Sequence, residues 1–288
     1  FYFEALSKET FILSNNWFMM FYLLTVFIGT VYPIFTQVLY DTKISVGPPF
    51  YNLVIGPIIV PFLILMAIGP KINWIKEKYK VLKSLILVII ISCILNLIIF
   101  YFFRGYDFIS NLIIISSLFL IFSSIKDFIL SKKNNSFLNV SSFISHLGFG
   151  TLIFFIILNH NFSKDFDLNI KVGETKKIEN IEIKFQSLNI ENRKNYNAIV
   201  GNFNIYNLKK NYQRILKPEI RVYDKPETLT FETAINSNFK RDLYLTMSNI
   251  DGSEFYNVKF QMKPFMLLIW LAAFLTASGG LIRIFIKK

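Results

Sequence analysis

Residues 81–103 read VLKSLILVIIISCILNLIIFYFF, and this stretch decides the fold. After Lys83 it holds no charged side chain, so an uninterrupted uncharged segment runs from position 84 to position 103. A helix needs about 20 such residues to cross the hydrocarbon core of a bilayer. Backbone N–H and C=O groups find no water there, and a single segment can pair them internally only as a helix. The stretch therefore predicts a transmembrane helix.

Five further apolar stretches lie on either side of this one. The six predicted helices cover 16–39, 53–69, 81–103, 108–130, 140–159 and 265–286. Pro57 and Pro61 lie inside the second stretch, so we expect that helix to be kinked or short. Charged residues make up only 17% of the chain, whereas soluble domains carry about 25%. The composition predicts an integral membrane α-helical bundle with about six transmembrane helices.

Basic side chains alternate between the loops in a way that predicts the orientation. The loops after the second and fourth helices and the C-terminal tail carry Lys71, Lys76, Lys78, Lys80, Lys83, Lys126, Lys132, Lys133, Arg283, Lys287 and Lys288. The other two short loops hold one basic residue each, Lys43 and Arg104. Cytoplasmic loops are enriched in lysine and arginine. We therefore expect both termini on the cytoplasmic side and the segment between the fifth and sixth helices outside.

The segment between the last two helices has the pattern of strands. Seven short stretches alternate or are rich in β-branched and aromatic residues: 168–172, 178–188, 196–207, 220–223, 229–235, 243–249 and 255–262. Turn-forming pairs such as Val172-Gly173 and Asp251-Gly252 separate them. The predicted organisation is a five-helix membrane region at 1–159, an external all-β sandwich or barrel at 160–263, and a last transmembrane helix with a basic cytoplasmic tail at 264–288.

Charge and cysteine content exclude other classes of protein. The net charge is +12, but residues 161–263 hold 17 basic against 13 acidic residues, so most of the excess flanks the apolar stretches. No basic face interleaved with stacking aromatics is present, and we expect no binding of nucleic acid. Cys93 is the single cysteine, which excludes a disulfide within the chain and a CxxCH haem-attachment site.

His146 is the most informative single residue. It lies about six residues inside the fifth predicted helix, or about 9 Å from its cytoplasmic end. An ionisable group within a membrane segment is a functional candidate by default. Ser142 and Gly150, one turn to either side, are small and predict a shallow recess beside the imidazole. Two interpretations stay open from the residues alone: a hydrogen bond between closely packed helices, or axial ligation of a haem or metal.

The other candidate residues lie at predicted surfaces. His160, at the outer end of the fifth helix, is expected to be an interfacial, solvated histidine. Residues 161–263 hold no histidine, cysteine or Gly-rich phosphate loop, so we expect no catalytic residue there. Two sets could dock a partner: an outer loop with Ser45, Gly47, Pro48, Pro49 and Tyr51, and a strand face with Glu219, Arg221 and Tyr223. The alternatives are interfacial anchoring for the loop and cross-strand pairing or solvation for the strand face.

Several short strings occur together in an order that resembles one family. They are SKE at 7–9, NN at 15–16, GTVYP at 29–33, ISVGPPFYN at 44–52, SHLG at 145–148, PEIRVY at 218–223, TAI at 233–235, DLY at 242–244 and KPF at 263–265, with Trp270 after them. Each string is weak by itself, but the ordered set resembles the C-terminal half of the CcmF/NrfE family of cytochrome c haem lyases.

The resemblance implies a chemistry and a set of partners. The family joins haem to the CxxCH cysteines of apocytochrome c, receives that haem from a periplasmic haem chaperone, and works with a subunit that presents the apocytochrome. It also carries a separate b haem in the membrane. His146 matches one axial ligand of that haem iron, with Ser142 and Gly150 beside it. The implied location is the bacterial inner membrane, or the mitochondrial equivalent, with the β domain in the periplasm.

The resemblance covers only half of the family's chains. The second membrane histidine, the tryptophan-rich external segment and its two flanking histidines belong to the N-terminal half. We therefore expect that this half is not competent alone, and that the gene is split or the chain is a fragment. The rival hypothesis is a cofactor-free membrane scaffold that docks partners through its β domain. A transporter is disfavoured, because the helices hold almost no charge beyond His146.

Overall fold

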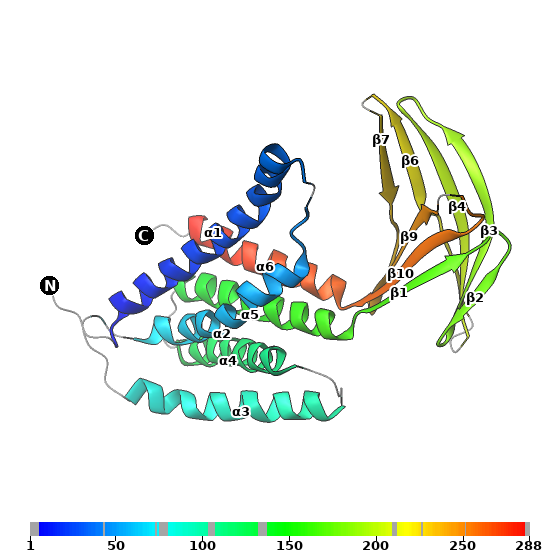
Figure 1. Cartoon of the computed structure of the whole chain (residues 1–288). Coiled ribbons are helices and arrows are strands. Elements are labelled where there is room, and N and C mark those ends of the chain that lie inside the picture. The colour runs from blue at the N-terminus through cyan, green and yellow to red at the C-terminus, as the bar shows by residue number, and fades with distance from the viewer. Residues whose placement is uncertain are drawn as a thin grey trace. The chain divides into compact units, whose positions relative to one another are not determined.

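The computed structural model describes residues 6–42, 44–72, 74, 80–102, 107–131, 137–208, 212–225, 227–250 and 252–285. The chain forms two compact units (Figure 1). The helical unit comprises Phe1–Ile157 and Leu268–Lys288, and the β unit comprises Leu158–Leu267. A helical bundle and one all-β domain were both predicted from the sequence, and both are confirmed.

Six helices are long and apolar enough to cross a membrane. They are α1 (Lys8–Tyr40), α2 (Pro48–Ile68), α3 (Lys80–Phe102), α4 (Phe108–Ser131), α5 (Phe137–Phe162) and α6 (Met266–Phe285). A short 3-10 turn, η1 (Gly69–Lys71), continues the chain after α2. All six predicted helices are present, and the differences lie at their ends.

Helix α1 begins eight residues before its predicted start. Ser7 is its N-cap, and the Ser7 hydroxyl accepts a hydrogen bond from the backbone N–H of Thr10 at 3.3 Å. Such a cap satisfies one of the free N–H groups of a first helical turn. The turns that follow carry Lys8, Glu9 and Asn15, so hydropathy alone did not mark them as helix.

Helix α2 is neither short nor interrupted. It begins at Pro48, runs past Pro57 and Pro61, and ends at Ile68. A proline in the first helical turn costs nothing, because its missing N–H would have no partner there. Membrane helices also tolerate internal prolines, since neighbouring helices satisfy the freed backbone groups. The predicted outer loop is therefore shorter than expected, and Pro48, Pro49 and Tyr51 lie in the first turn of α2.

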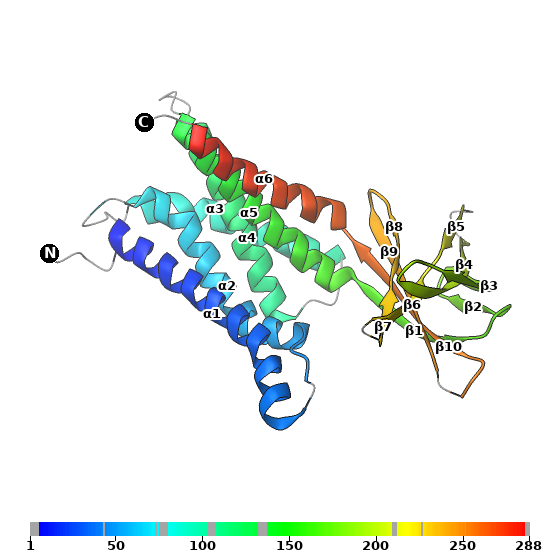
Figure 2. The ribbon, with the colours of Figure 1, turned by 90° about the horizontal axis from the view of Figure 1, so that it is seen from above.

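Helix α4 is the centre of the bundle. In its most apolar stretch, 56% of the residues are buried inside the protein, against 11–22% in the corresponding stretches of the other five helices. It contacts both α2 and α3, as Figures 1 and 2 show. Buried serines run along it: Ser110, Ser116, Ser117, Ser123 and Ser124. Small side chains of this kind let membrane helices approach one another closely.

Helices α5 and α6 approach each other through two glycines. A Cβ on Gly148 would lie 2.6 Å from the backbone nitrogen of Thr276, and one on Gly279 would lie 2.5 Å from that of Ser145. The Ser141 hydroxyl donates a hydrogen bond to the Gly279 carbonyl at 2.8 Å. Only glycine permits this separation, so these positions fix α5 against α6.

The β unit is a curled sandwich of two antiparallel sheets. Its strands are β1 (Lys164–Ile170), β2 (Thr175–Ile178), β3 (Ile181–Asn192), β4 (Tyr196–Asn207), β5 (Tyr212–Leu216), β6 (Glu219–Asp224), β7 (Glu227–Glu232), β8 (Ala234–Ser237), β9 (Arg241–Asn249) and β10 (Tyr256–Pro264). One sheet has the order β1-β10-β9-β8, and the other has the order β2-β3-β4-β6-β7, with β5 also paired to β4. Phe185 and Phe203 stack at 4.2 Å in the core, which also buries Met247 and Phe260.

The two ends of the β unit meet. Strand β1 pairs with β10, the last strand, so that Lys164 lies opposite Met262. The Asn159 side chain donates a hydrogen bond to the Pro264 carbonyl at 2.5 Å, and the rings of Phe162 and Phe265 lie 6.1 Å apart. The chain therefore leaves the β unit beside the place where it entered.

The sequence correctly predicted strands in this segment, but it missed one strand and several strand boundaries. The predicted stretch 178–188 contains the end of β2 and most of β3, divided by Glu179 at a φ of 50°. The predicted stretch 229–235 contains the end of β7 and the start of β8, which belong to different sheets and are divided by Thr233. Strand β5 was not predicted. Alternation continues across a tight turn or a change of sheet, so the pattern alone does not locate such breaks.

The orientation prediction depends in part on residues outside the described ones. Lys43, Lys76, Lys78, Arg104, Lys132, Lys133, Lys287 and Lys288 all lie there. The side on which the β unit lies therefore stays a prediction.

Candidate functional site

His146 lies nine residues after the first residue of α5, on the wall of two cavities. Its side chain is half-buried. Throughout the described chain, no residue forms a hydrogen bond with the imidazole. The predicted interhelical hydrogen bond is therefore not among the contacts that the structure shows. An ionisable ring that faces open space in a bundle is available to a ligand.

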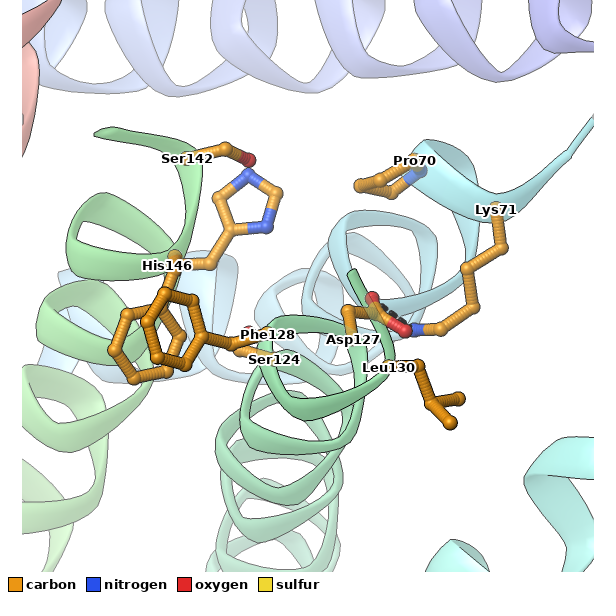
Figure 3. A pocket seen from close by; sticks show the side chains of 9 residues that line it. Pro70, Lys71, Ser124, Asp127, Phe128, Leu130, Ser142 and His146 are labelled. Atoms are coloured by element: carbon orange, nitrogen blue, oxygen red, sulfur yellow. Dashed lines mark ion pairs between the residues drawn. The ribbon is translucent and has the colours of Figure 1, made fainter. Parts of the chain in front are cut away.

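The first cavity has a volume of about 390 Å³ and lies among η1, α4 and α5 (Figure 3). Ser142, predicted to lie beside His146, lines it together with His146 itself. The rings of Phe128 and Phe143 lie on its wall and stack at 4.3 Å. Pro70 and His146 line both this cavity and the second one.

An ion pair between Lys71 and Asp127 borders the first cavity. The Lys71 Nζ lies 2.8 Å from Asp127 Oδ2, and the two side chains are 12% and 38% exposed. The same nitrogen donates to the Ala67 carbonyl at 2.7 Å and to the Ser123 hydroxyl. The pair joins η1 to α4 and adds no net charge to the cavity. Sequence reasoning placed Lys71 and Lys126 in basic loops and did not find this pair, because its members are far apart along the chain.

The second cavity has a volume of about 330 Å³ and lies between α1 and the end of α2. Its walls carry the apolar side chains of Phe11, Ile12, Leu65 and Met66. Lys8 and Asn15 are the polar residues of α1 that line it, and His146 contributes the imidazole. Sequence reasoning missed this cavity because the first turns of α1 were not predicted to be helical.

Gly150 was expected in the recess beside His146, but it lies against α4. It is buried, and a Cβ there would meet Ile121 Cγ1 at 2.9 Å and the Ser117 carbonyl at 3.4 Å. Gly150 lines neither cavity, and it lets α4 approach α5 closely. The predicted recess beside the imidazole is thus present on the Ser142 side, whereas α4 fills the space at Gly150.

The predicted docking residues occupy two separate surfaces. Ser45 before α2 and Pro48 and Pro49 in its first turn are exposed, and Gly47, the N-cap of α2, is half-buried. Tyr51 packs against α1, because its hydroxyl lies 2.5 Å from the position that a Cβ on Gly29 would take. A docking role for this segment stays a prediction.

The strand-face residues lie together on β6, as their alternation predicted. Arg221 donates to Glu219 at 2.8 Å and lies 3.8 Å from Glu232. The Arg221 guanidinium also lies 4.9 Å from the centre of the Tyr196 ring, which is 5.1 Å from Tyr223. The hydrogen bonds of the guanidinium to Glu219 and Tyr223 raise the pKa of Arg221. Cross-strand pairing, the predicted alternative, is therefore present, and a docking role for this face stays a prediction.

Other metal chemistry finds no support in the described part of the chain. No group of three or more His, Cys, Asp or Glu side chains gathers there. His160 is exposed in the last turn of α5, in agreement with a solvated histidine.

Comparisons with known proteins agree with these observations. Residues 161–264 match a family model described as the CcmF C-terminal β-sandwich. The chain is 26% identical to the cytochrome c-type biogenesis protein CcmF of Haemophilus influenzae, over 99% of this chain and 46% of the relative. For CcmF of Escherichia coli the values are 25%, 97% and 44%, and for NrfE of Haemophilus influenzae 25%, 98% and 45%.

The fold is also that of a solved structure. The cytochrome c haem lyase CcmF superposes with a TM-score of 0.74 at 19% identity, over 98% of this chain and 46% of that one. The chain spans less than half the length of the curated relatives it matches. The predicted resemblance to the C-terminal half of the CcmF/NrfE family is confirmed.

Proposed function

We propose that this chain, as a match to the C-terminal half of the CcmF/NrfE haem lyases, takes part in joining haem to apocytochrome c and holds a b haem through His146. The observation that carries the proposal is the imidazole of His146. It lines two cavities inside an apolar bundle and has no hydrogen-bond partner in the described residues. The similarity to cytochrome c-type biogenesis proteins over nearly the whole chain supports the biological role.

The residues around His146 fit a haem. A haem is a flat and largely apolar ring, and its iron takes a neutral imidazole nitrogen as axial ligand. The cavities on either side of Pro70 have volumes of about 390 and 330 Å³, and aromatic and aliphatic side chains line both. A bound b haem would supply one-electron chemistry. The part of this chain is to place the imidazole and to exclude water.

The second axial ligand must come from outside this chain. His160 is the other histidine, and it lies 14 residues further along α5, or about 21 Å at about 1.5 Å per residue. A single haem iron cannot bind both. We propose that the N-terminal half of the lyase, in the same chain or a separate one, supplies that ligand.

The haem that is attached to the cytochrome is a substrate, distinct from the b haem. Each thioether forms when a cysteine S–H adds across a haem vinyl group, so that the sulfur binds one carbon and the hydrogen the other. We propose the periplasmic haem chaperone, the apocytochrome c-presenting subunit and apocytochrome c as partners. The β unit would lie in the periplasm of a bacterial inner membrane, or in the equivalent mitochondrial compartment, with the Glu219–Arg221–Tyr223 face and the exposed residues before α2 as candidate docking surfaces.

Replacing His146 by alanine tests the proposal. In the lyase purified with its partner subunits, we expect His146→Ala to remove or convert the low-spin b-haem absorption spectrum and to impair cytochrome c maturation. His160→Ala is the matched control, since it removes a histidine from the same helix without reaching either cavity. Unchanged haem content and spectrum in the His146→Ala protein would return His146 to a packing role. A preparation without any haem bands would favour the cofactor-free scaffold.

A further inference from the structure

The two cavities that share His146 differ in their charge. One is bordered by the Lys71–Asp127 pair, and the other by Lys8. A haem carries two propionate carboxylates on one edge of its ring, so a cation at one of these cavities can select the orientation of the ring. The inference below rests on the proposed binding of haem by His146.

Lys71 has no donor left for a carboxylate. A lysine ammonium group has three N–H donors and no acceptor. Asp127, the Ala67 carbonyl and the Ser123 hydroxyl are three acceptors on Lys71 Nζ. A ligand carboxylate would have to displace one of them and would then lie close to the carboxylate of Asp127. Repulsion between like charges disfavours that arrangement.

Lys8 is in the opposite situation. Its Nζ lies 5.3 Å from the centre of the Trp74 ring, and among the described residues it has no acidic partner. Asn15, the other polar residue of α1 at this cavity, likewise has no hydrogen-bond partner in the part of the chain described. The cavity therefore offers a cation and an amide to a ligand, with no carboxylate among its lining residues.

The geometry of α1 places these groups in a row. Lys8, Phe11, Ile12 and Asn15 are spaced at i, i+3, i+4 and i+7, so they share one face of the helix. Leu65 and Met66 of α2 close the apolar wall opposite. Because Lys8 is the first residue of α1, the N-terminal end of the helix dipole adds to the attraction for an anion.

We propose that the ring of the His146-bound haem occupies the cavity between α1 and α2, and that Lys8 binds one of its propionate carboxylates. The Phe11, Ile12, Leu65 and Met66 side chains then contact the ring, and His146 reaches the iron. The Lys71–Asp127 pair holds η1 against α4 and makes no contact with the carboxylates.

Haem and its dimethyl ester, titrated into the haem-free lyase purified in detergent with its N-terminal half, test this proposal. The ester keeps the ring and the iron but has no free carboxylate. A lysine ammonium and a carboxylate form a charge-assisted hydrogen bond, so we expect the wild type to bind the free acid about tenfold or more tightly than the ester. We expect Lys8→Gln to bind both about equally. Lys83→Gln, at an exposed lysine in the first turn of α3, should keep the preference.

The readouts separate the possible failures. A His146-dependent absorption spectrum that Lys8→Gln keeps shows that the bundle is intact. If Lys8→Gln does not fold, Lys8→Arg takes its place in the test. A Lys8→Arg protein that still prefers the free acid to the ester supports the proposal, and equal affinities for the two overturn it. A Lys8→Gln protein that still prefers the free acid, or a Lys71→Gln/Asp127→Asn double variant that loses the preference, also overturns it. A wild-type lyase with no His146-dependent spectrum refutes the binding of haem itself, and this inference with it.

Discussion

Replacing Gly148 by alanine should destabilise the helical unit, although alanine is the better helix former. The added Cβ would lie 2.6 Å from the backbone nitrogen of Thr276, whereas ordinary van der Waals contact begins at 3.4 Å. Helices α5 and α6 must therefore separate by about 0.8 Å, since backbone atoms cannot turn aside. Overpacking of this kind costs roughly 1–3 kcal/mol, and the gain in helix propensity offsets roughly 1 kcal/mol of it. We expect a net loss of up to about 2 kcal/mol in the free energy of unfolding.

Gly280 supplies the matched control. It lies in the same helix as Gly279, and a Cβ there would meet nothing within 4 Å. Gly280→Ala should leave stability unchanged or raise it by up to about 1 kcal/mol. Thermal unfolding in detergent, followed by the helical circular dichroism signal, measures both variants. Equal transition temperatures for Gly148→Ala and Gly280→Ala would refute the close approach of α5 and α6.

Two further predictions concern the whole chain. Single cysteines at Asn192 and Asn73, in a Cys93→Ser background, should be labelled from opposite sides of the membrane, and equal labelling from outside intact cells would overturn the orientation. The segment 161–263, expressed alone, should give a β-type circular dichroism spectrum and bind no stoichiometric haem, whereas a mainly helical spectrum would contradict its fold.

Much of the helical unit could be predicted because the bilayer imposes a length on each helix. Uncharged runs such as 84–103 are sufficient evidence for that, and no tertiary contact is needed to recognise them. The start of α1 escaped prediction because the Ser7 cap and the polar residues after it form a helical turn without apolar periodicity. A search for the capping pattern of serine followed by an acidic first turn would have found it.

The candidate site could be predicted only in part. His146 was found because a histidine within an apolar run is rare, and that argument requires no structure. The atoms that surround Gly150 depend on how α4 packs against α5. The ion pair of Lys71 with Asp127 depends on how the end of α2 meets α4. Neither follows from the periodicity of a single helix. The cavity at Lys8 was missed for the same reason, since two helices have to come together to form it.

The pairing of β1 with β10 has a consequence for biosynthesis. These strands are separated by almost the whole β unit, so the sheet that they share has a high contact order and cannot close until the last strand has been synthesised. Hairpins such as β3–β4 depend on neighbours along the chain and can form earlier. During vectorial synthesis, β1 therefore lacks its strand partner until β10 arrives, just before α6 emerges from the ribosome. A truncation within β10 would leave β1 exposed to other chains and make the nascent protein prone to aggregation.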